Sequence, residues 1–280
     1  MLAGLHYDLT TRNTHMPVPC NGGFTFGNRR FGCWDKRGHG SLDLVGALQF
    51  SCDVYFYQLG LELGLDRLHA VARALGLGER TGVDLPAETR GLVPDDEWYD
   101  KRFKVGHWPR GVLLNLGIGQ GELLVSPLQL ATMTSVVANG GHPVRPHVVR
   151  AVAGIPAFRV AKPVETGLES APEHWTAVHD AMRKVVDAGT ATGARLPGIG
   201  VGGKTGTAQN PHGNDHALFV CYAPTDHPTI ALAIVAENSG HGGSVCAPLA
   251  AHVLRRVLLR DSLVTSPPRV VVDTTGAAGD

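Results

Sequence analysis

The sequence predicts an α/β fold in which an antiparallel sheet carries helices on its faces. Two apolar, β-compatible runs, His216–Ala223 and 229–236, are joined by a five-residue segment that begins and ends with proline, as expected of a hairpin. Amphipathic helical patterns precede and follow this hairpin, at 172–186 and 247–259. Apolar residues make up 43% of the 280 residues and charged residues 18%, a composition that favours a folded domain with a buried core.

Residues 41–140 are predicted to be mainly helical. Ser41 is a candidate N-cap for a first helix, and apolar residues recur after it at spacings of three and four. A second helix is predicted over 66–75, where two glycines follow. The third has the clearest start, because Ser126 precedes a proline at the first helical position and an apolar stripe continues to Val137.

Residues 1–40 are predicted to be loop-like, because they are rich in glycine and proline and contain two cysteines. Leu2, Leu5 and Leu9 nevertheless have the spacing of a helix that is already under way at the first residue. The start has neither a basic region nor a long apolar core, so it is not a signal peptide. We therefore expect the chain to be a fragment of a longer protein.

Charge and hydropathy exclude two classes of protein. Lys and Arg together number 25, as do Asp and Glu, so a binder of nucleic acid or another polyanion is not indicated. No run of about 18 uncharged apolar residues is present, so no segment is predicted to span a bilayer. We expect one domain over residues 1–260 and a loose tail over 261–280, where Ser, Thr, Pro and Gly dominate.

The segment Gly203-Lys204-Thr205-Gly206-Thr207 precedes the hairpin and is the sharpest motif. Residues 198–205 also fit the pattern of a phosphate-binding loop, but that loop needs a buried strand before it and a helix after it, and the flanking Gly, Asn and Pro residues predict neither. On a strand that lines a cleft, the motif instead brings together a lysine cation, threonine hydroxyls and, at Gly206, a backbone N–H without a side chain to shield it. This set suits a substrate carboxylate and the oxyanion that develops in acyl transfer.

A second motif, Ser51-Cys52-Asp53, lies between two predicted helices. On its own it indicates no more than a local helix cap. Combined with Lys204-Thr205-Gly206-Thr207 about 150 residues later, it matches two of the three elements of penicillin-binding proteins and class A β-lactamases.

Further phrases across residues 1–260 strengthen this match. The chain resembles the transpeptidase domain of class B penicillin-binding proteins, in particular the penicillin-binding protein 2 group that acts in rod elongation. The phrases are Gly38-His39-Gly40, Val54-Tyr55-Phe56-Tyr57-Gln58, Thr81-Gly82-Val83-Asp84-Leu85-Pro86, Gly117-Ile118-Gly119-Gln120-Gly121, Asp215-His216-Ala217-Leu218-Phe219 and Gly240-His241-Gly242-Gly243-Ser244.

The resemblance implies the fold of penicillin-recognising serine transpeptidases and β-lactamases, an antiparallel sheet flanked by helices plus a helical lobe. It implies peptidoglycan D,D-transpeptidation, in which a serine takes the acyl group of a stem peptide and passes it to an amine of a neighbouring strand. The partners implied are stem peptides, β-lactams and the cell-elongation machinery, including a membrane glycosyltransferase, but no nucleic acid. The place implied is the periplasmic face of the bacterial inner membrane.

The resemblance also assigns roles to the two motifs. Ser51 and Asp53 organise proton transfer, and Lys204 supplies positive potential. Thr205 and Thr207 hold the terminal carboxylate of the substrate, and the Thr207 N–H contributes to the oxyanion hole. Gly206 lets the substrate backbone lie close.

The chain departs from the family at the third element. None of its nine serines has a lysine three residues later, so the Ser-x-x-Lys tetrad that carries the nucleophile is absent. We expect the tetrad to lie directly upstream of Met1 and residues 1–280 alone to be inactive. A non-catalytic scaffold module and a D,D-carboxypeptidase or β-lactamase-type hydrolase are the alternatives.

Four residues near the start of the chain form a candidate metal site. Cys20, Cys33, His39 and Cys52 are three thiols and one imidazole, a known ligand set of structural Zn²⁺. The resemblance supports zinc near Ser51-Cys52-Asp53 in some members of the family. A Cys20–Cys33 disulfide, favoured by an oxidising compartment, and three separate buried thiols are the alternatives.

Overall fold

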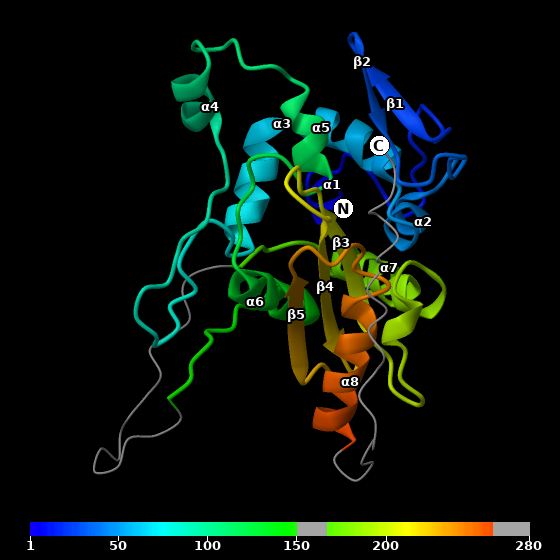
Figure 1. The fold of residues 1–280 in the computed structure, drawn as a ribbon, viewed down its shortest axis with the longest axis vertical. Helices are drawn as coiled ribbons and strands as arrows, with labels where there is room; N and C mark the ends of the chain where they lie inside the picture. Colours follow the sequence, from blue (N-terminus) through cyan, green and yellow to red (C-terminus); the bar gives the residue numbers. More distant parts are fainter. Residues whose placement is uncertain (150–166, 260–280) are drawn as a thin grey trace.

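The computed structural model describes residues 1–149 and 167–259, and it places a helical lobe at one end and a sheet at the other (Figure 1). The lobe contains α1 Leu2–His6, β1 Gly23–Phe26, β2 Arg29–Gly32, α2 Leu44–Gln49, α3 Asp53–Ala74, α4 Asp96–Arg102 and α5 Val112–Gly117. The sheet half contains α6 Pro127–Ala138, α7 Pro172–Ala188, the short 3₁₀ helix η1 Thr192–Ala194, β3 Gly202–Ala208, β4 His216–Ala223, β5 Ile230–Ala236 and α8 Cys246–Leu258.

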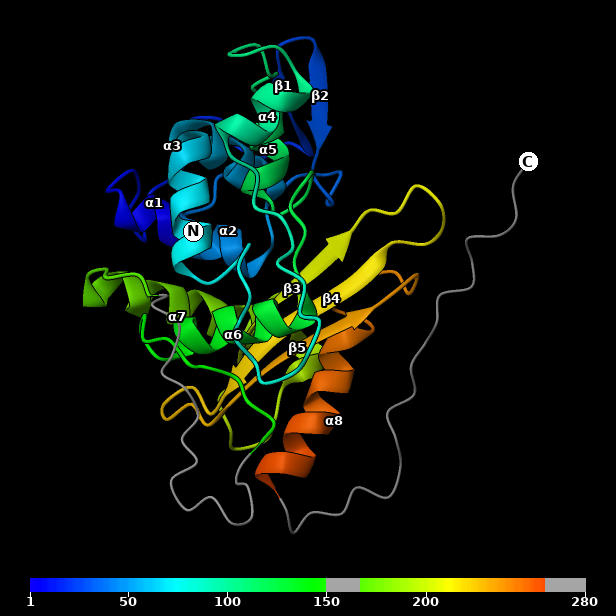
Figure 2. The same cartoon turned by 90° about the vertical axis from the view of Figure 1, so that its left-hand side faces the viewer.

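The sheet is antiparallel with the strand order β3-β4-β5, so β3 forms one edge. Because side chains alternate along a strand, Phe219 and Cys221 of β4 face the core that α8 completes, while Tyr222 packs with the core that α7 completes. Helices α6 and α7 thus cover one face of the sheet and α8 the other (Figure 2). The predicted hairpin, β4 with β5, and the predicted helix-flanked sheet are confirmed.

The predicted starts of α6 and α7 are also confirmed. The Ser126 hydroxyl accepts a hydrogen bond from the Gln129 N–H at 3.2 Å, and the Gln129 side chain accepts from the Ser126 N–H at 2.8 Å, which forms a complete capping box. Helix α7 starts at Pro172, as predicted, and ends at Ala188, two residues beyond the predicted range.

The predicted cap of the first helix is wrong. Helix α2 is capped by Asp43, whose carboxylate accepts from the Gly46 N–H at 2.6 Å, whereas the Ser41 hydroxyl is hydrogen-bonded to His15. Asp43 directly precedes the first helical residue, so its carboxylate reaches the N–H of the third helical residue, Gly46, as a capping side chain does.

The predicted helix over 66–75 is the second half of α3. Helix α3 continues from Asp53 to Ala74 and contains one non-helical residue, Gly64, at φ 75° and ψ 174°. A positive φ is readily adopted only by glycine, so Gly64 marks the boundary between the two halves.

Helices α3 and α5 make a close backbone contact in the lobe. A Cβ at Gly60 would lie 2.6 Å from the Leu113 carbonyl oxygen, and a Cβ at Gly117 would lie 2.6 Å from the Phe56 carbonyl oxygen. Since no larger side chain fits either position, the two helices are held together as one unit.

Residues 1–40 contain more regular structure than predicted. Helix α1 confirms the start indicated by the leucine spacing, although it ends before Leu9. Strands β1 and β2 form a hairpin in which Phe24 pairs with Phe31. The sequence did not predict these strands for two reasons. The segment is rich in glycine and proline, and strands of four residues are too short to show a clear alternating pattern.

The predicted tail, 261–280, lies outside the described residues. Among the residues that are described, no helix has both the length and the apolar character needed to cross a membrane.

Candidate active site and metal centre

Ser51 and Lys204 come from opposite halves of the fold and are in direct contact. Ser51 lies in the turn between α2 and α3 with a positive φ of 52°, a strained conformation for a residue with a side chain. Lys204 lies on β3, and its Nζ donates a hydrogen bond to the Ser51 hydroxyl. The structure therefore brings together two motifs that are 153 positions apart in the chain.

Lys204 is held at the sheet edge by a second hydrogen bond, from its Nζ to the Thr205 carbonyl oxygen at 2.8 Å. Burial lowers the pKa of Lys204 to about 8, and the negative charge of Asp53 opposes this shift. Because Lys204 lies within a strand and no helix follows it directly, the phosphate-binding loop is excluded.

Asp53 is turned toward the segment after Cys33 rather than directly onto the sheet. Its Oδ2 accepts a hydrogen bond from the Trp34 N–H at 2.9 Å. Burial raises the pKa of Asp53 to about 7, and the negative charge of Cys33 adds to the effect, while Lys204 acts in the opposite direction. Asp53 thus interacts with Lys204 through its charge.

The two threonines of the β3 motif have different partners. The Thr205 hydroxyl is hydrogen-bonded to the Thr190 hydroxyl at 2.8 Å, and the Thr207 carbonyl accepts from the Gln120 side-chain amide at 3.1 Å. Gly206, between them, pairs with Leu218 of β4, and a Cβ there would lie 3.2 Å from the Leu218 Cβ. The neighbouring strand thus leaves little room for a side chain at this position.

Sequence reasoning did not assign site roles to Thr190 or Gln120. Thr190 follows α7 and has no motif around it that points to β3. For Gln120 a signal did exist, because it lies between Gly119 and Gly121, which both adopt a positive φ, 77° and 84°. Paired glycines of this kind mark a sharp turn that directs the residue between them.

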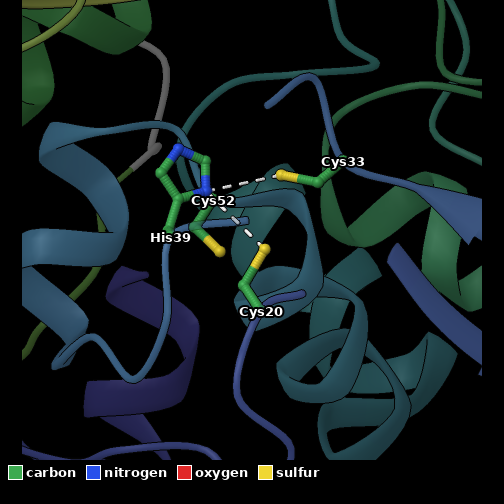
Figure 3. A group of neighbouring side chains, drawn as sticks. All are labelled: Cys20, Cys33, His39 and Cys52. Atoms are coloured by element: carbon green, nitrogen blue, oxygen red, sulfur yellow. Dashed lines mark hydrogen bonds between the residues drawn. The ribbon is translucent and has the colours of Figure 1, made fainter. Parts of the chain in front are cut away.

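The four predicted metal ligands lie together beside the Ser51 turn (Figure 3). The ligand atoms of Cys20, Cys33, His39 and Cys52 all lie within 4.8 Å of one another, and all three thiols are free and buried. We call these four residues the cysteine cluster. The alternative Cys20–Cys33 disulfide is not formed, and the three thiols lie together rather than apart, contrary to the second alternative.

The geometry of the cysteine cluster fits a tetrahedral Zn²⁺. His39 Nδ1 lies 3.7 Å from Cys20 Sγ and 3.5 Å from Cys33 Sγ. Zinc bonds of about 2.3 Å to sulfur and about 2.0–2.1 Å to nitrogen at a tetrahedral angle place S and N about 3.6 Å apart. His39 Nε2 is buried without a hydrogen-bond partner in the described part of the chain, so the thiols, rather than an outer acceptor, are the partners of this ring.

One thiol of the cysteine cluster, Cys33, favours the thiolate, the form that binds a metal. The hydrogen bond that Cys52 donates lowers the pKa of Cys33 to about 4, against the opposing effect of burial, and the same bond raises the pKa of Cys52. Cys52 is flanked by Ser51 and Asp53, and Cys33 by Trp34, whose N–H holds Asp53. A metal bound by both thiols would therefore fix the backbone on two sides of the Ser51 turn.

A family model of the penicillin binding protein transpeptidase domain matches residues 1–255. The chain belongs to this family. Among solved structures, PBP2 of Pseudomonas aeruginosa is 36% identical, with a TM-score of 0.84 over 95% of this chain and 59% of that protein. PBP2 of Helicobacter pylori in complex with MreC is 33% identical, with a TM-score of 0.78 over 92% of this chain and 48% of that one.

Curated relatives have the same character. The peptidoglycan D,D-transpeptidase MrdA of Acinetobacter baumannii is 38% identical over 260 residues, which is 87% of this chain and 38% of the relative. MrdA of Escherichia coli K12 is 30% identical over 289 residues, 95% of this chain and 45% of the relative. The match thus covers most of this chain but less than half of either relative. The predicted family, fold and kinship with the penicillin-binding protein 2 group are confirmed.

Proposed function

We propose that this chain is the C-terminal part of a peptidoglycan D,D-transpeptidase that cross-links stem peptides by serine acyl transfer during cell elongation. The contact between Ser51 and Lys204 carries the proposal, because it assembles one hydroxyl, one cation and the Thr205–Thr207 backbone at a free strand edge. The similarity to D,D-transpeptidases of two species supports the same activity.

The nucleophile of this reaction comes from outside residues 1–280, since no Ser-x-x-Lys occurs among them. Its hydroxyl oxygen forms a bond to the penultimate D-Ala carbonyl carbon, and the bond to the terminal D-Ala nitrogen breaks as that nitrogen receives a proton. The acceptor amine then loses a proton as its nitrogen forms a bond to the same carbon, and the serine oxygen takes up a proton as its bond to that carbon breaks. The Ser51 hydroxyl, which accepts a hydrogen bond from Lys204, passes the proton to the leaving nitrogen in our proposal.

The remaining residues bind and orient the acyl donor. Lys204 gives the β3 edge positive potential, which attracts the terminal carboxylate of the donor. The hydroxyls of Thr205 and Thr207 donate to this carboxylate, and the Thr207 N–H is directed at the developing oxyanion. The Thr190 hydroxyl orients that of Thr205.

The cysteine cluster, in our proposal, holds a structural Zn²⁺ that supplies no chemistry beyond fixing the backbone. The fit of the S–N distances supports zinc, as does the lowered pKa of Cys33. Metal analysis of protein purified without chelator should give one zinc per chain, and its absence would contradict this assignment.

We further propose that the full protein acts at the periplasmic face of the inner membrane, with the elongation machinery and a membrane glycosyltransferase as partners. Two similar structures support this, since one is a PBP2–MreC complex and another is a peptidoglycan synthase complex that coordinates polymerization and crosslinking.

Labelling with a fluorescent penicillin tests the function. The protein translated from the first in-frame Ser-x-x-Lys upstream of codon 1 should retain the label after denaturation, whereas residues 1–280 alone should not. An unlabelled longer protein would favour the non-catalytic scaffold. Peptide release without transfer to an added acceptor amine would favour the carboxypeptidase.

A further inference from the structure

Two hydrogen bonds connect the helical lobe to the edge of β3. One joins Ser51 to Lys204, and the other joins Gln120 to the Thr207 carbonyl at 3.1 Å. Since a strand advances roughly 3.3 Å per residue, the two contacts are separated by roughly 10 Å along β3. The contact at Lys204 belongs to the proposed chemistry, and the contact at Gln120 has no role in it so far.

The edge of β3 is open to a partner strand, but its carbonyls are already occupied. Strand β4 pairs with β3 on one side, and no strand of the described residues pairs with the other. The carbonyls of Thr205 and Thr207 both accept hydrogen bonds from side chains, Lys204 Nζ at 2.8 Å and Gln120 Nε2 at 3.1 Å. Thr205 and Thr207 are two residues apart, so their backbone carbonyls point to the same side of β3.

An extended peptide that joins such an edge forms main-chain hydrogen bonds with these same outward groups. The N–H and C=O of one residue point to the same side, so a donor whose carbonyl reaches the Thr207 N–H also brings its own amides near the Thr207 carbonyl. That carbonyl is occupied by the Gln120 amide, and one lone-pair direction rarely serves two donors well. The incoming amide and Gln120 therefore compete for one acceptor.

The local structure lets Gln120 move. Its side chain is only half-buried, and it lies in a loop whose backbone is fixed by the Gln120 N–H bond to the Asn115 carbonyl at 2.9 Å. No atom lies within 4 Å of a Cβ built at Gly119, so the loop is open directly before Gln120, whereas a Cβ at Gly121 would lie 3.3 Å from the Asn115 Cβ. The Gln120 amide can leave Thr207 by rotation of its own side chain, without a change in the fold.

We propose that Gln120 is a positioning residue that occupies the Thr207 carbonyl in the empty site and is exchanged for an amide N–H of the acyl donor. A donor that carries an amide at this position forms one hydrogen bond but first breaks the one from Gln120, so Gln120 lowers the preference of the site for such donors. A donor without this amide leaves Gln120 in place. This inference rests on the proposed function and adds the specificity of the same site.

The test compares two β-lactams in the labelled full-length protein. One is a penicillin with an acylamino side chain, and the other is a carbapenem, which carries a hydroxyethyl group in place of the amide. We measure the acylation efficiency of each in the wild type and in the Gln120→Leu and Gln120→Glu variants. Neither variant can donate to Thr207 at neutral pH.

The ratio of the two efficiencies, penicillin over carbapenem, should rise about fivefold in both variants, the factor equivalent to one net hydrogen bond. The gain should lie in the concentration that gives half-maximal acylation and not in the limiting rate. The added charge of Gln120→Glu should lower both efficiencies alike and leave the raised ratio intact. Gln209→Leu, the same substitution at an exposed glutamine just after β3, is the matched control and should leave the ratio unchanged.

Three outcomes would overturn the inference. Equal losses for both β-lactams in Gln120→Leu would make Gln120 a strut between lobe and sheet, and unchanged efficiencies for both would mean that no exchange takes place. A wild type that takes up neither compound would remove the proposed function itself, which distinguishes that failure from the other two. Thermal unfolding of both variants identifies any loss that comes from folding.

Discussion

Ser51 and Cys52 are adjacent in the chain, but their side chains belong to two regions with opposite properties. Ser51 faces the catalytic edge, by which we mean Ser51, Lys204, Thr205 and Thr207, where the contacts are hydrogen bonds between partly buried polar groups. Cys52 faces the cysteine cluster, where all three thiols are buried. We infer that the catalytic edge takes part in the reaction and that the cysteine cluster holds the reacting groups in place. The predictions below test this division of roles.

The largest effect is expected from Lys204→Ala. Loss of the cation at the catalytic edge should lower the acylation efficiency of the full-length protein about 10²- to 10³-fold, as removal of an oxyanion-stabilising donor does. The unfolding temperature should change little, because burial already disfavours the charged amine in the folded state. Penicillin labelling and thermal unfolding measure both quantities. Lys184→Ala, at an exposed position of α7, is the control, and an equal loss there would show that the effect is not local.

Changes in the cysteine cluster should lower both stability and activity. Cys20→Ser should abolish stoichiometric zinc, lower the unfolding temperature and reduce acylation about 10- to 100-fold, because the partners of metal sites act by orienting their neighbours. Metal analysis, thermal unfolding and labelling provide the three readouts. Cys221→Ala removes a buried thiol of β4 and should retain zinc. Full activity in metal-free Cys20→Ser protein would show that the two regions are independent.

The pH dependence of acylation should show whether the reaction needs the positive charge of Lys204. Above a pH of about 8, Lys204 loses its proton, and acylation should fall by up to about tenfold per pH unit. Lys204→Arg keeps its charge and should remove this decline, so a decline that persists in that variant would assign the titration to another group.

The lowered pKa of Lys204 also determines how the free energy of unfolding changes with pH. The folded state binds the Lys204 proton less tightly than the unfolded chain does, because burial lowers the pKa from 10.5 to about 8. The contribution of Lys204 to the free energy of unfolding should therefore rise with pH between about 8 and 10.5. Denaturant titrations of the wild type and Lys204→Ala across this range isolate that contribution.

The smallest effect on chemistry is expected within the lobe. Gly117→Ala places a Cβ 2.6 Å from the Phe56 carbonyl oxygen and should destabilise the fold by about 1–3 kcal/mol, as overpacking does. Gly111→Ala meets only Phe31 at 3.6 Å and should stay within about 0.5 kcal/mol of the wild type. Denaturant unfolding measures both, and equal values would show that the α3–α5 contact can relax.

The sequence was most informative where local chemistry decides the structure. Ser126 and Pro172 mark helix starts through their own hydrogen bonds or fixed φ, so α6 and α7 could be predicted. The start of α2 could not, since Ser41 and Asp43 are both good caps and only the packing selects Asp43.

The site shows the same division. Recognition of Ser51 and Lys204 came from motifs, and the residue types of the cysteine cluster, three thiols and one imidazole, together with the family resemblance, indicated its members. The contacts of Thr190 and Gln120 depend on how the segments after α7 and α5 meet β3. The glycines beside Gln120 indicate a turn, but no local pattern identifies its partner on β3. Residues that support a site through tertiary packing are therefore the ones that sequence reasoning misses.

The glycine contact between α3 and α5 has one further consequence. The Ser51 turn leads directly into α3, and the Gln120 loop follows α5, so both contacts with β3 are attached to one rigid body. A movement of that body away from the sheet would break them simultaneously. Occupation of one end of β3 is then felt at the other without any intervening chain of side chains, and the two ends should show thermodynamic coupling in a double-mutant cycle.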